Sequence, residues 1–149
     1  MSLTRLLDDQ RARLDTLASL LEEERTLLLD GQPDGRALQR LADDKARLHD
    51  TLESTEARRA EVQQRLGYVA GPAGARQAAE DAGCLPQWEA TLDAARRVSR
   101  LNTGNGHLLS VRMTHNQHTL DYIHRLADPD VYAADGRAGL QTRRLNAQA

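Results

Sequence analysis

The stretch from Trp88 to Ala127, WEATLDAARRVSRLNTGNGHLLSVRMTHNQHTLDYIHRLA, decides the fold of this chain. Residues taken alternately four and three apart keep one phase over the whole stretch, which is typical of a helix packed along one face against a partner. A continuous helix of this length is about 60 Å long. The row is apolar at both ends and polar in the middle: Trp88, Leu92, Ala95, Ser99, Asn102, Gly106, Leu109, Met113, Asn116, Leu120, Ile123 and Ala127.

The middle of this stretch, Asn102-Thr103-Gly104-Asn105-Gly106, conflicts with its flanks. On propensity alone it is a turn, because two glycines inside a helix cost about 2 kcal/mol relative to alanine. The apolar row nevertheless continues in phase on both sides. We therefore expect an unbroken or slightly kinked helix, in which Gly106 lets a neighbouring helix approach closely and the two asparagines form hydrogen bonds. A plain turn between two helices is the alternative.

Two further helices are predicted before this stretch, over residues 3–29 and 36–66. Breakers and turn formers gather in the segment 30–35, so the chain reverses there and the two helices form an antiparallel hairpin. Each helix carries its own row with the 4,3 spacing. The first row is Leu3, Leu7, Gln10, Leu14, Leu17, Leu21, Glu24 and Leu28, and the second is Leu38, Leu41, Lys45, Leu48, Leu52, Thr55, Arg59, Val62 and Leu66.

Opposite charges occupy one position in each of these two rows. Glu24 lies shortly before the turn, and Lys45, the only lysine of the chain, lies shortly after it. Their offset along paired helices is about 6 Å, which two long side chains can bridge. One interpretation is a partly buried ion pair that fixes the register of the helices. The other is a lysine that extends its charged end into solvent at the edge of the hairpin.

The remaining segments complete an all-α fold, an elongated antiparallel three-helix bundle or coiled coil. Residues 67–85 form the connector between the hairpin and the long helix, which is expected over 86–127, so residues 1–127 make a single helical domain. After Ala127 the sequence Asp128-Pro129-Asp130 breaks the helix. The tail, residues 128–149, contains few apolar residues, and we expect it to be flexible and to order only on a partner.

Composition and charge exclude several classes of protein. The net charge of −2 predicts no general attraction to nucleic acid or anionic membranes, and the basic residues of the long helix are offset by acidic residues of the first. One cysteine cannot form an intrachain disulfide. No apolar run approaches the about 20 residues that span a bilayer. We expect a cytoplasmic protein without membrane insertion.

Catalysis and metal binding are not expected. His115 and His118 lie one helical turn apart with Asp121 one turn further, which is a weak zinc pattern, but no cysteine or glutamate cluster completes four ligands. No glycine-rich phosphate loop and no paired nucleophile are present. The sequence therefore predicts a protein that is not an enzyme and that needs no cofactor.

The chain resembles the FlgN type of flagellar export chaperone. The matching features are Glu24 and Lys45 on either side of the turn, the Asn102-x-x-Asn105-Gly106 motif, and a tyrosine just past the last helix, Tyr132, followed by Gly136. They occur in the right order along nearly the whole length. The family usually has Leu-Tyr-Gly at the tyrosine, whereas this chain has Val131-Tyr132-Ala133.

The resemblance implies a cytoplasmic chaperone for flagellar hook-associated proteins, which form the hook–filament junction. It holds their helical termini unassembled and delivers them to the flagellar type III export apparatus, its gate and its ATPase components. The family binds its cargo through the C-terminal third and docks on the export gate through the tyrosine, here Tyr132. The expected cargo-binding residues are Leu109, Met113, Asn116, Leu120, Ile123 and Leu126.

Helix lengths support a binding role for the end of the long helix. The hairpin arms are shorter than this helix, so its last turns, with Leu120, Ile123 and Leu126, are expected to lack a partner helix within the monomer. An unpartnered apolar row suits a helix that docks with i, i+3, i+4, i+7 spacing. A self-associating structural coiled coil without cargo is the alternative function, and a homodimer is one further association that this face permits.

Overall fold

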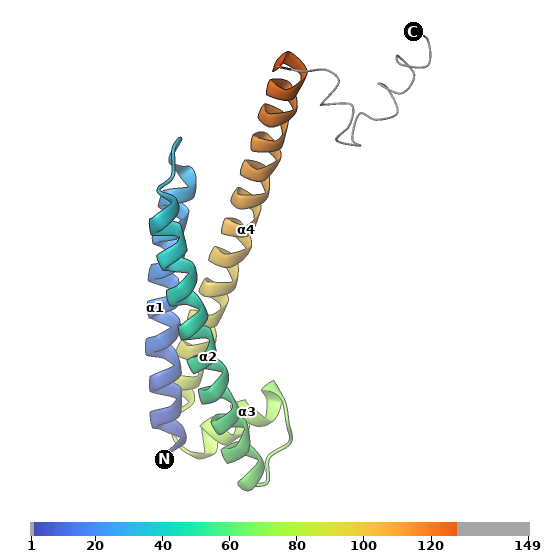
Figure 1. The fold of residues 1–149 in the computed structure, drawn as a ribbon. Helices are drawn as coiled ribbons and strands as arrows, with labels where there is room; N and C mark the ends of the chain where they lie inside the picture. Colours follow the sequence, from blue (N-terminus) through green and yellow to red (C-terminus); the bar gives the residue numbers. More distant parts are fainter. Residues whose placement is uncertain (1, 128–149) are drawn as a thin grey trace, which may run out of the picture. The chain divides into compact units, whose positions relative to one another are not determined.

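The computed structural model describes residues 2–127, and they form four helices (Figure 1). These helices are α1 (Leu3–Leu29), α2 (Gly35–Arg65), α3 (Pro72–Asp81) and α4 (Leu85–Ala127). The described residues contain no strand, so the all-α prediction is confirmed. The chain divides into two compact units, residues 1–108 and residues 109 onward, which are described separately below. The long helix α4 contributes to both.

Local signals start and stop the first two helices. The Ser2 hydroxyl accepts a hydrogen bond from the backbone N–H of Arg5, and the Asp34 carboxylate accepts bonds from the N–H groups of Arg36 and Ala37. These side chains satisfy donors that every helix leaves unpaired at its N-terminus. The chain reverses between the two helices, over residues 30–34.

Helices α1 and α2 pack as an antiparallel hairpin. Contacts between them pair early residues of α1 with late residues of α2, because Gln10 hydrogen-bonds Glu56 whereas Glu24 hydrogen-bonds Lys45. All residues of the predicted α1 row are buried or half-buried, and so are those of the α2 row as far as Val62. Leu66 is exposed instead, because α2 ends at Arg65 and Leu66 serves as its C-cap.

The first part of α4 runs parallel to α1. The Thr91 hydroxyl donates to the carbonyl oxygen of Leu7, and the Asn105 amide donates to that of Leu21. Both bonds join residues that are 84 positions apart in the sequence. Because this separation is the same at both places, α1 and α4 run in the same direction. Helix α4 therefore also runs opposite to α2. The first unit is a three-helix bundle with alternating helix directions.

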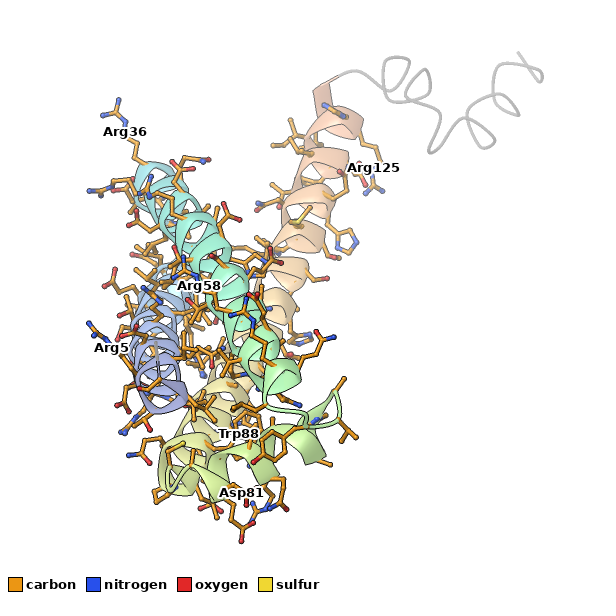
Figure 2. The ribbon with its side chains drawn as sticks, turned by 90° about the horizontal axis from the view of Figure 1, so that it is seen from below. Arg5, Arg36, Arg58, Asp81, Trp88 and Arg125 are labelled. Atoms are coloured by element: carbon orange, nitrogen blue, oxygen red, sulfur yellow. The ribbon has the colours of Figure 1, made fainter. Side chains whose placement is uncertain are left out.

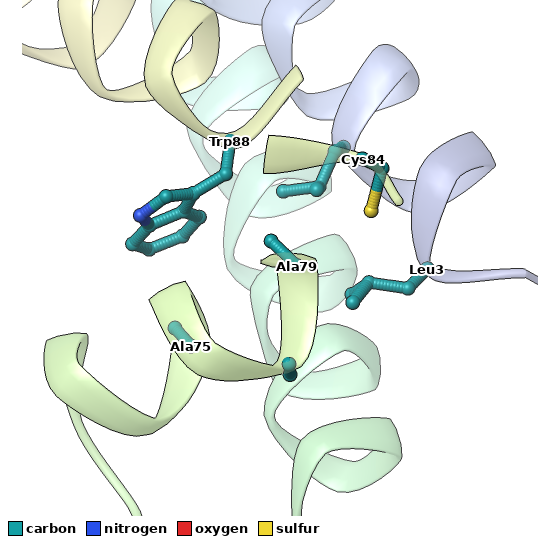
Figure 3. Close-up of a cluster of buried hydrophobic side chains, with 7 residues drawn as sticks. Leu3, Ala75, Ala79, Cys84 and Trp88 are labelled. Atoms are coloured by element: carbon teal, nitrogen blue, oxygen red, sulfur yellow. The ribbon is translucent and has the colours of Figure 1, made fainter. Parts of the chain in front are cut away.

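The connector contains the short helix α3 at the end of the bundle that carries the N-terminus (Figure 1). Pro72 starts it, and Gly71 before it adopts a φ of 98°, in the left-handed region that favours glycine. Its alanines pack under α1 and the start of α4 (Figure 3). The cluster consists of Leu3, Leu7, Ala75, Ala78, Ala79, Cys84 and Trp88. Small side chains let α3 lie close to the other helices.

Candidate functional site

The interior of the bundle contains a polar centre built from three helices. Lys45 of α2 donates a hydrogen bond to the carboxylate of Glu24 on α1, with 2.5 Å between Nζ and Oε2. Asn105 of α4 donates to the other oxygen of the same carboxylate over 3.0 Å. The Lys45 and Glu24 side chains are only 26% and 14% exposed. Of the two interpretations of Lys45, the structure has the partly buried pair, and it adds Asn105 as a third partner.

A second polar layer lies nearer to α3 and centres on Arg59. The Arg59 side chain is 9% exposed. Its guanidinium donates to both carboxylate oxygens of Glu56 over 2.8 and 2.6 Å and to Gln63 over 2.8 Å. It also lies over the ring of Trp88, 5.4 Å from the centroid, as a cation–π contact. Figure 2 shows Trp88 inside the bundle, whereas Arg36 points away from the first turn of α2.

The fold lowers the pKa of the Glu56 carboxyl group, although this group is partly buried. Partial burial alone raises the pKa of its carboxyl group, because burial penalises the charged form. The hydrogen bonds from Arg59 and Gln10, together with the positive charge of Arg59, outweigh that effect, so the pKa lies below its ordinary value. Glu56 is therefore a permanent anion at neutral pH that ties α1 to α2.

The residues of α4 that are buried in the bundle lie about one sequence position away from those of the predicted row. Thr91, Ala94 and Asn105 are buried, whereas Asn102 and Gly106 are exposed. The placement of Asn102 and Gly106 on the packed face was therefore wrong. No neighbouring atom would come within 4 Å of a side chain at Gly106, so it does not serve a close approach. The helix itself is unbroken through this segment, so the predicted continuity is confirmed.

The second unit contains the proposed cargo-binding residues on α4. Leu109, Met113, Asn116, Leu120 and Ile123 lie on one face through their 4,3 spacing, and we call this set the distal row. Every member is exposed, and the exposed fraction of its four large apolar side chains ranges from 47% to 62%. Leu126, 69% exposed, lies beside the row. The structure thus places all six predicted residues on an accessible helix surface.

The remaining expectations concern the tail, metal ligands and the membrane. Tyr132 and the tail lie outside the described residues. Within residues 2–127, no group of three or more histidine, cysteine or acidic side chains is placed to bind a metal ion. No helix of that part of the chain is long and apolar enough to cross a membrane. Sequence reasoning missed the contact of Arg59 with Trp88, although both residues were on predicted rows.

Comparisons with protein families and with individual proteins point to the same family. The FlgN protein family matches residues 1–139. The chain belongs to the FlgN family. It is 28% identical to the flagella synthesis protein FlgN of Salmonella typhimurium over 141 residues, which cover 95% of this chain and 93% of that protein. It is 29% identical to the FlgN protein of Proteus mirabilis over 136 residues, with 91% and 89% covered. No solved structure gives a significant match.

Membership of the FlgN family fits the all-helical structure and the order of the motifs. The match extends beyond Ala127, so the family resemblance includes the segment with Tyr132. Of the three motif residues that the sequence analysis placed within α4, only Asn105 reaches the interior of the bundle. Its contact with Glu24 joins two of the motif positions directly.

Proposed function

We infer that this FlgN-family protein is a cytoplasmic export chaperone in flagellum assembly. It binds the helical termini of hook-associated proteins, prevents their premature assembly and delivers them to the flagellar type III export apparatus. Its relatives are named flagella synthesis protein FlgN, and these names support a role in flagellum assembly. The accessible distal row supports the mode of binding, because an amphipathic helix docks through apolar residues at this spacing.

The observation that carries the proposal is the exposure of the distal row. Four large apolar side chains, each about half exposed, follow one another along one face of α4. Contiguous apolar patches on a soluble protein usually mark a surface for a partner. An amphipathic helical terminus of a hook-associated protein would dock on the distal row through an apolar row of its own. Covering both rows at once keeps each protein from aggregating.

Charge substitution in the distal row tests this role. The double variant Leu120→Asp/Ile123→Asp should keep its helix content and melting temperature, because both side chains are already exposed. It should no longer retain hook-associated proteins when purified from a flagellated host and examined by mass spectrometry. The matched control, Val111→Asp/Thr114→Asp, places two charges on another face of the same helix and should bind normally.

Three results would contradict the cargo-binding role of the distal row. Unfolding of the Leu120→Asp/Ile123→Asp variant would show that these residues belong to a packed core. Recovery of the unchanged protein only with itself, as a stable oligomer without hook-associated proteins, would favour the structural coiled coil instead. Equal loss of cargo in the control variant would show that the binding does not use the distal row.

Docking on the export gate is assigned to Tyr132 by the family resemblance. Replacement of Tyr132 by alanine should reduce export of hook-associated proteins while leaving folding and cargo binding intact. Tyr122→Ala is the matched control, since Tyr122 is exposed on α4 and carries no assigned role. A fall of several degrees in the melting temperature of Tyr132→Ala would show a structural role in place of docking.

A further inference from the structure

A cavity of about 610 Å³ lies in the first unit, between the second half of α2 and the loop that leads into α3. Its volume is within the range of about 300–1,000 Å³ that is usual for ligand sites. We call it the α2–α3 cavity. Glutamate, glutamine and arginine side chains line it together with three alanines and a tyrosine, which are Ala57, Ala60, Tyr68 and Ala70.

Hydrogen bonds fix the wall of this cavity. The side-chain amide of Gln63, which is 3% exposed, donates to the carbonyl oxygens of Val69 and Gly71 and so ties the loop to α2. The Tyr68 hydroxyl donates to the carboxylate of Asp81 on α3 over 2.6 Å. The wall is therefore formed before any ligand binds, so binding does not have to order it.

Arg59 brings hydrogen-bond donors to the cavity. Its side chain is 9% exposed, and the residue lines the cavity. A guanidinium has five N–H groups, and the bonds to Glu56 and Gln63 use one each on Nε, Nη1 and Nη2. Among the described residues 2–127, the other two N–H groups have no acceptor. Because a shielded donor without a partner costs free energy, a ligand oxygen placed here gains a favourable bond.

The charges around the cavity favour a neutral ligand. Glu56 is paired with Arg59, and Glu61 is paired with Arg65 over 2.6 Å. The two carboxylates oppose an anion, and the guanidinium opposes a cation. A neutral carbonyl oxygen can accept from Arg59 without bringing a net charge into a partly shielded place, where an unpaired charge is costly.

Exposed apolar side chains beside the cavity indicate a ligand larger than one amino acid. Leu66 and Val69 flank Tyr68 in the loop and are 58% and 71% exposed. A small molecule that fills the cavity would leave both in water. An extended peptide advances by about 3.3 Å per residue, so three residues can fill the cavity and also cover apolar surface beside it.

We propose that the α2–α3 cavity binds a short, extended, uncharged peptide segment of a partner protein. One apolar side chain of the segment packs between the alanines and Tyr68, and one of its main-chain carbonyl oxygens accepts hydrogen bonds from Arg59. The site belongs to the first unit, whereas the distal row belongs to the second. The inference therefore does not rest on the chaperone function, and each can fail without the other.

Nuclear magnetic resonance titration of the isotope-labelled full chain tests the ligand chemistry. The first probe is N-acetyl-leucine methylamide, which has an apolar side chain and two neutral carbonyl groups. The side-chain N–H signals of Arg59 and the indole signal of Trp88, whose ring lies against it, should shift and saturate with a Kd of about 1 mM. Isocaproate, an anion with a similar apolar group, should bind at least about tenfold more weakly. Equal or tighter binding of isocaproate, or no shift up to about 20 mM amide, overturns the proposal.

Two substitutions in α2 test the place of binding. Ala60→Leu fills the cavity from an exposed position, so it should abolish the shifts while the melting temperature stays the same. The matched control is Ala46→Leu, at an exposed position of α2 that does not line the cavity, and it should bind normally. Arg59→Lys keeps the charge but removes the forked N–H groups, and should weaken binding about fivefold or more. Normal binding by Ala60→Leu would contradict the proposed site.

Peptide length distinguishes a partner segment from a free small molecule. The peptide N-acetyl-Leu-Ala-Leu methylamide should bind about tenfold more tightly than the single-residue amide. The double variant Leu66→Ser/Val69→Ser should remove this gain and leave binding of the single-residue amide unchanged, because both side chains lie at the exposed loop. Equal affinities of the two probes for the wild-type protein would indicate a small-molecule site and overturn the peptide ligand.

Discussion

The side-chain amide of Asn105 donates a 2.7 Å hydrogen bond to the backbone carbonyl oxygen of Leu21, and so joins α4 to α1. The same amide also reaches Glu24, which is paired with Lys45 of α2. Asn105 is only 3% exposed. One asparagine thus connects the three long helices of the first unit at a single level.

Removal of this amide should destabilise the bundle. We expect Asn105→Ala to lower the free energy of unfolding by about 1–3 kcal/mol, because it leaves buried polar groups without a donor. The matched control is Asn102→Ala, one helical turn away and exposed, which should change it by less than about 0.5 kcal/mol. Urea denaturation followed by circular dichroism measures both. Equal effects would show that Asn105 acts only through helix propensity.

Asn105 is buried and Asn102 is exposed, which shows that the sequence pattern alone does not predict which face of α4 is packed. A second apolar row, with Val98, Leu101 and Leu108, runs beside the predicted row on this helix. Polar residues interrupt both rows, so the spacing fits either one. The choice depends on which face meets α1, which is a tertiary contact. The hairpin was easier to predict, because leucines occupy one row of each arm and the turn between the arms is rich in breakers.

The polar layers illustrate a second limit. Arg59 stands on the predicted α2 row, but its partners come from three places in the sequence. Glu56 and Gln63 are local and follow helical spacing, whereas Trp88 arrives only when α4 packs. Helix α3 in the connector has a weak apolar periodicity for a different reason, because alanine is its main apolar residue and most of its other residues are polar. Local sequence signals therefore predict where helices form, but they predict less well which residues make contacts between helices.

The Lys45–Glu24 pair should contribute to stability. We expect Lys45→Met to lower the free energy of unfolding by about 1–2 kcal/mol, since it removes a charge-assisted hydrogen bond in a largely shielded place. Arg47→Met, whose side chain is 74% exposed, is the control and should have little effect. A double-mutant cycle with Glu24→Gln isolates the pair, and a coupling energy of zero would show that the two side chains do not stabilise each other.

Truncation of Arg59 should lower the free energy of unfolding more than truncation of its neighbour Arg58. Arg59→Ala removes the bonds to Glu56 and Gln63 and the contact with Trp88, so we expect a loss of about 2–3 kcal/mol. Arg58→Ala, which changes an exposed arginine, should cost less than about 0.5 kcal/mol. Thermal melts of both variants decide this. Similar melting temperatures would contradict a structural role for the layer.

Glu56 should make the stability depend on acidity. Its pKa is lowered in the folded protein, so its contribution is present above the unfolded pKa and is lost as the pH falls through the lower folded value. Glu56→Gln should therefore reduce the melting temperature at neutral pH, and the difference from the wild type should shrink below about pH 4.5. Glu53→Gln, an exposed control, should show no comparable trend. A difference that stays constant with pH would exclude ionisation as the cause.

Replacement by alanine should change the free energy of unfolding in opposite directions at Gly74 and Gly106. A Cβ atom at Gly74 would lie 1.8 Å from the carbonyl oxygen of Val69, so Gly74→Ala must displace the loop that leads into α3. A Cβ atom at Gly106 would meet nothing within 4 Å, and the residue lies inside α4. We expect Gly106→Ala to raise the free energy of unfolding by about 0.5–1 kcal/mol and Gly74→Ala to lower it by at least that amount. Denaturant melts measure both signs. A destabilised Gly106→Ala would mean that a neighbour does approach this position, as its place in the sequence first suggested.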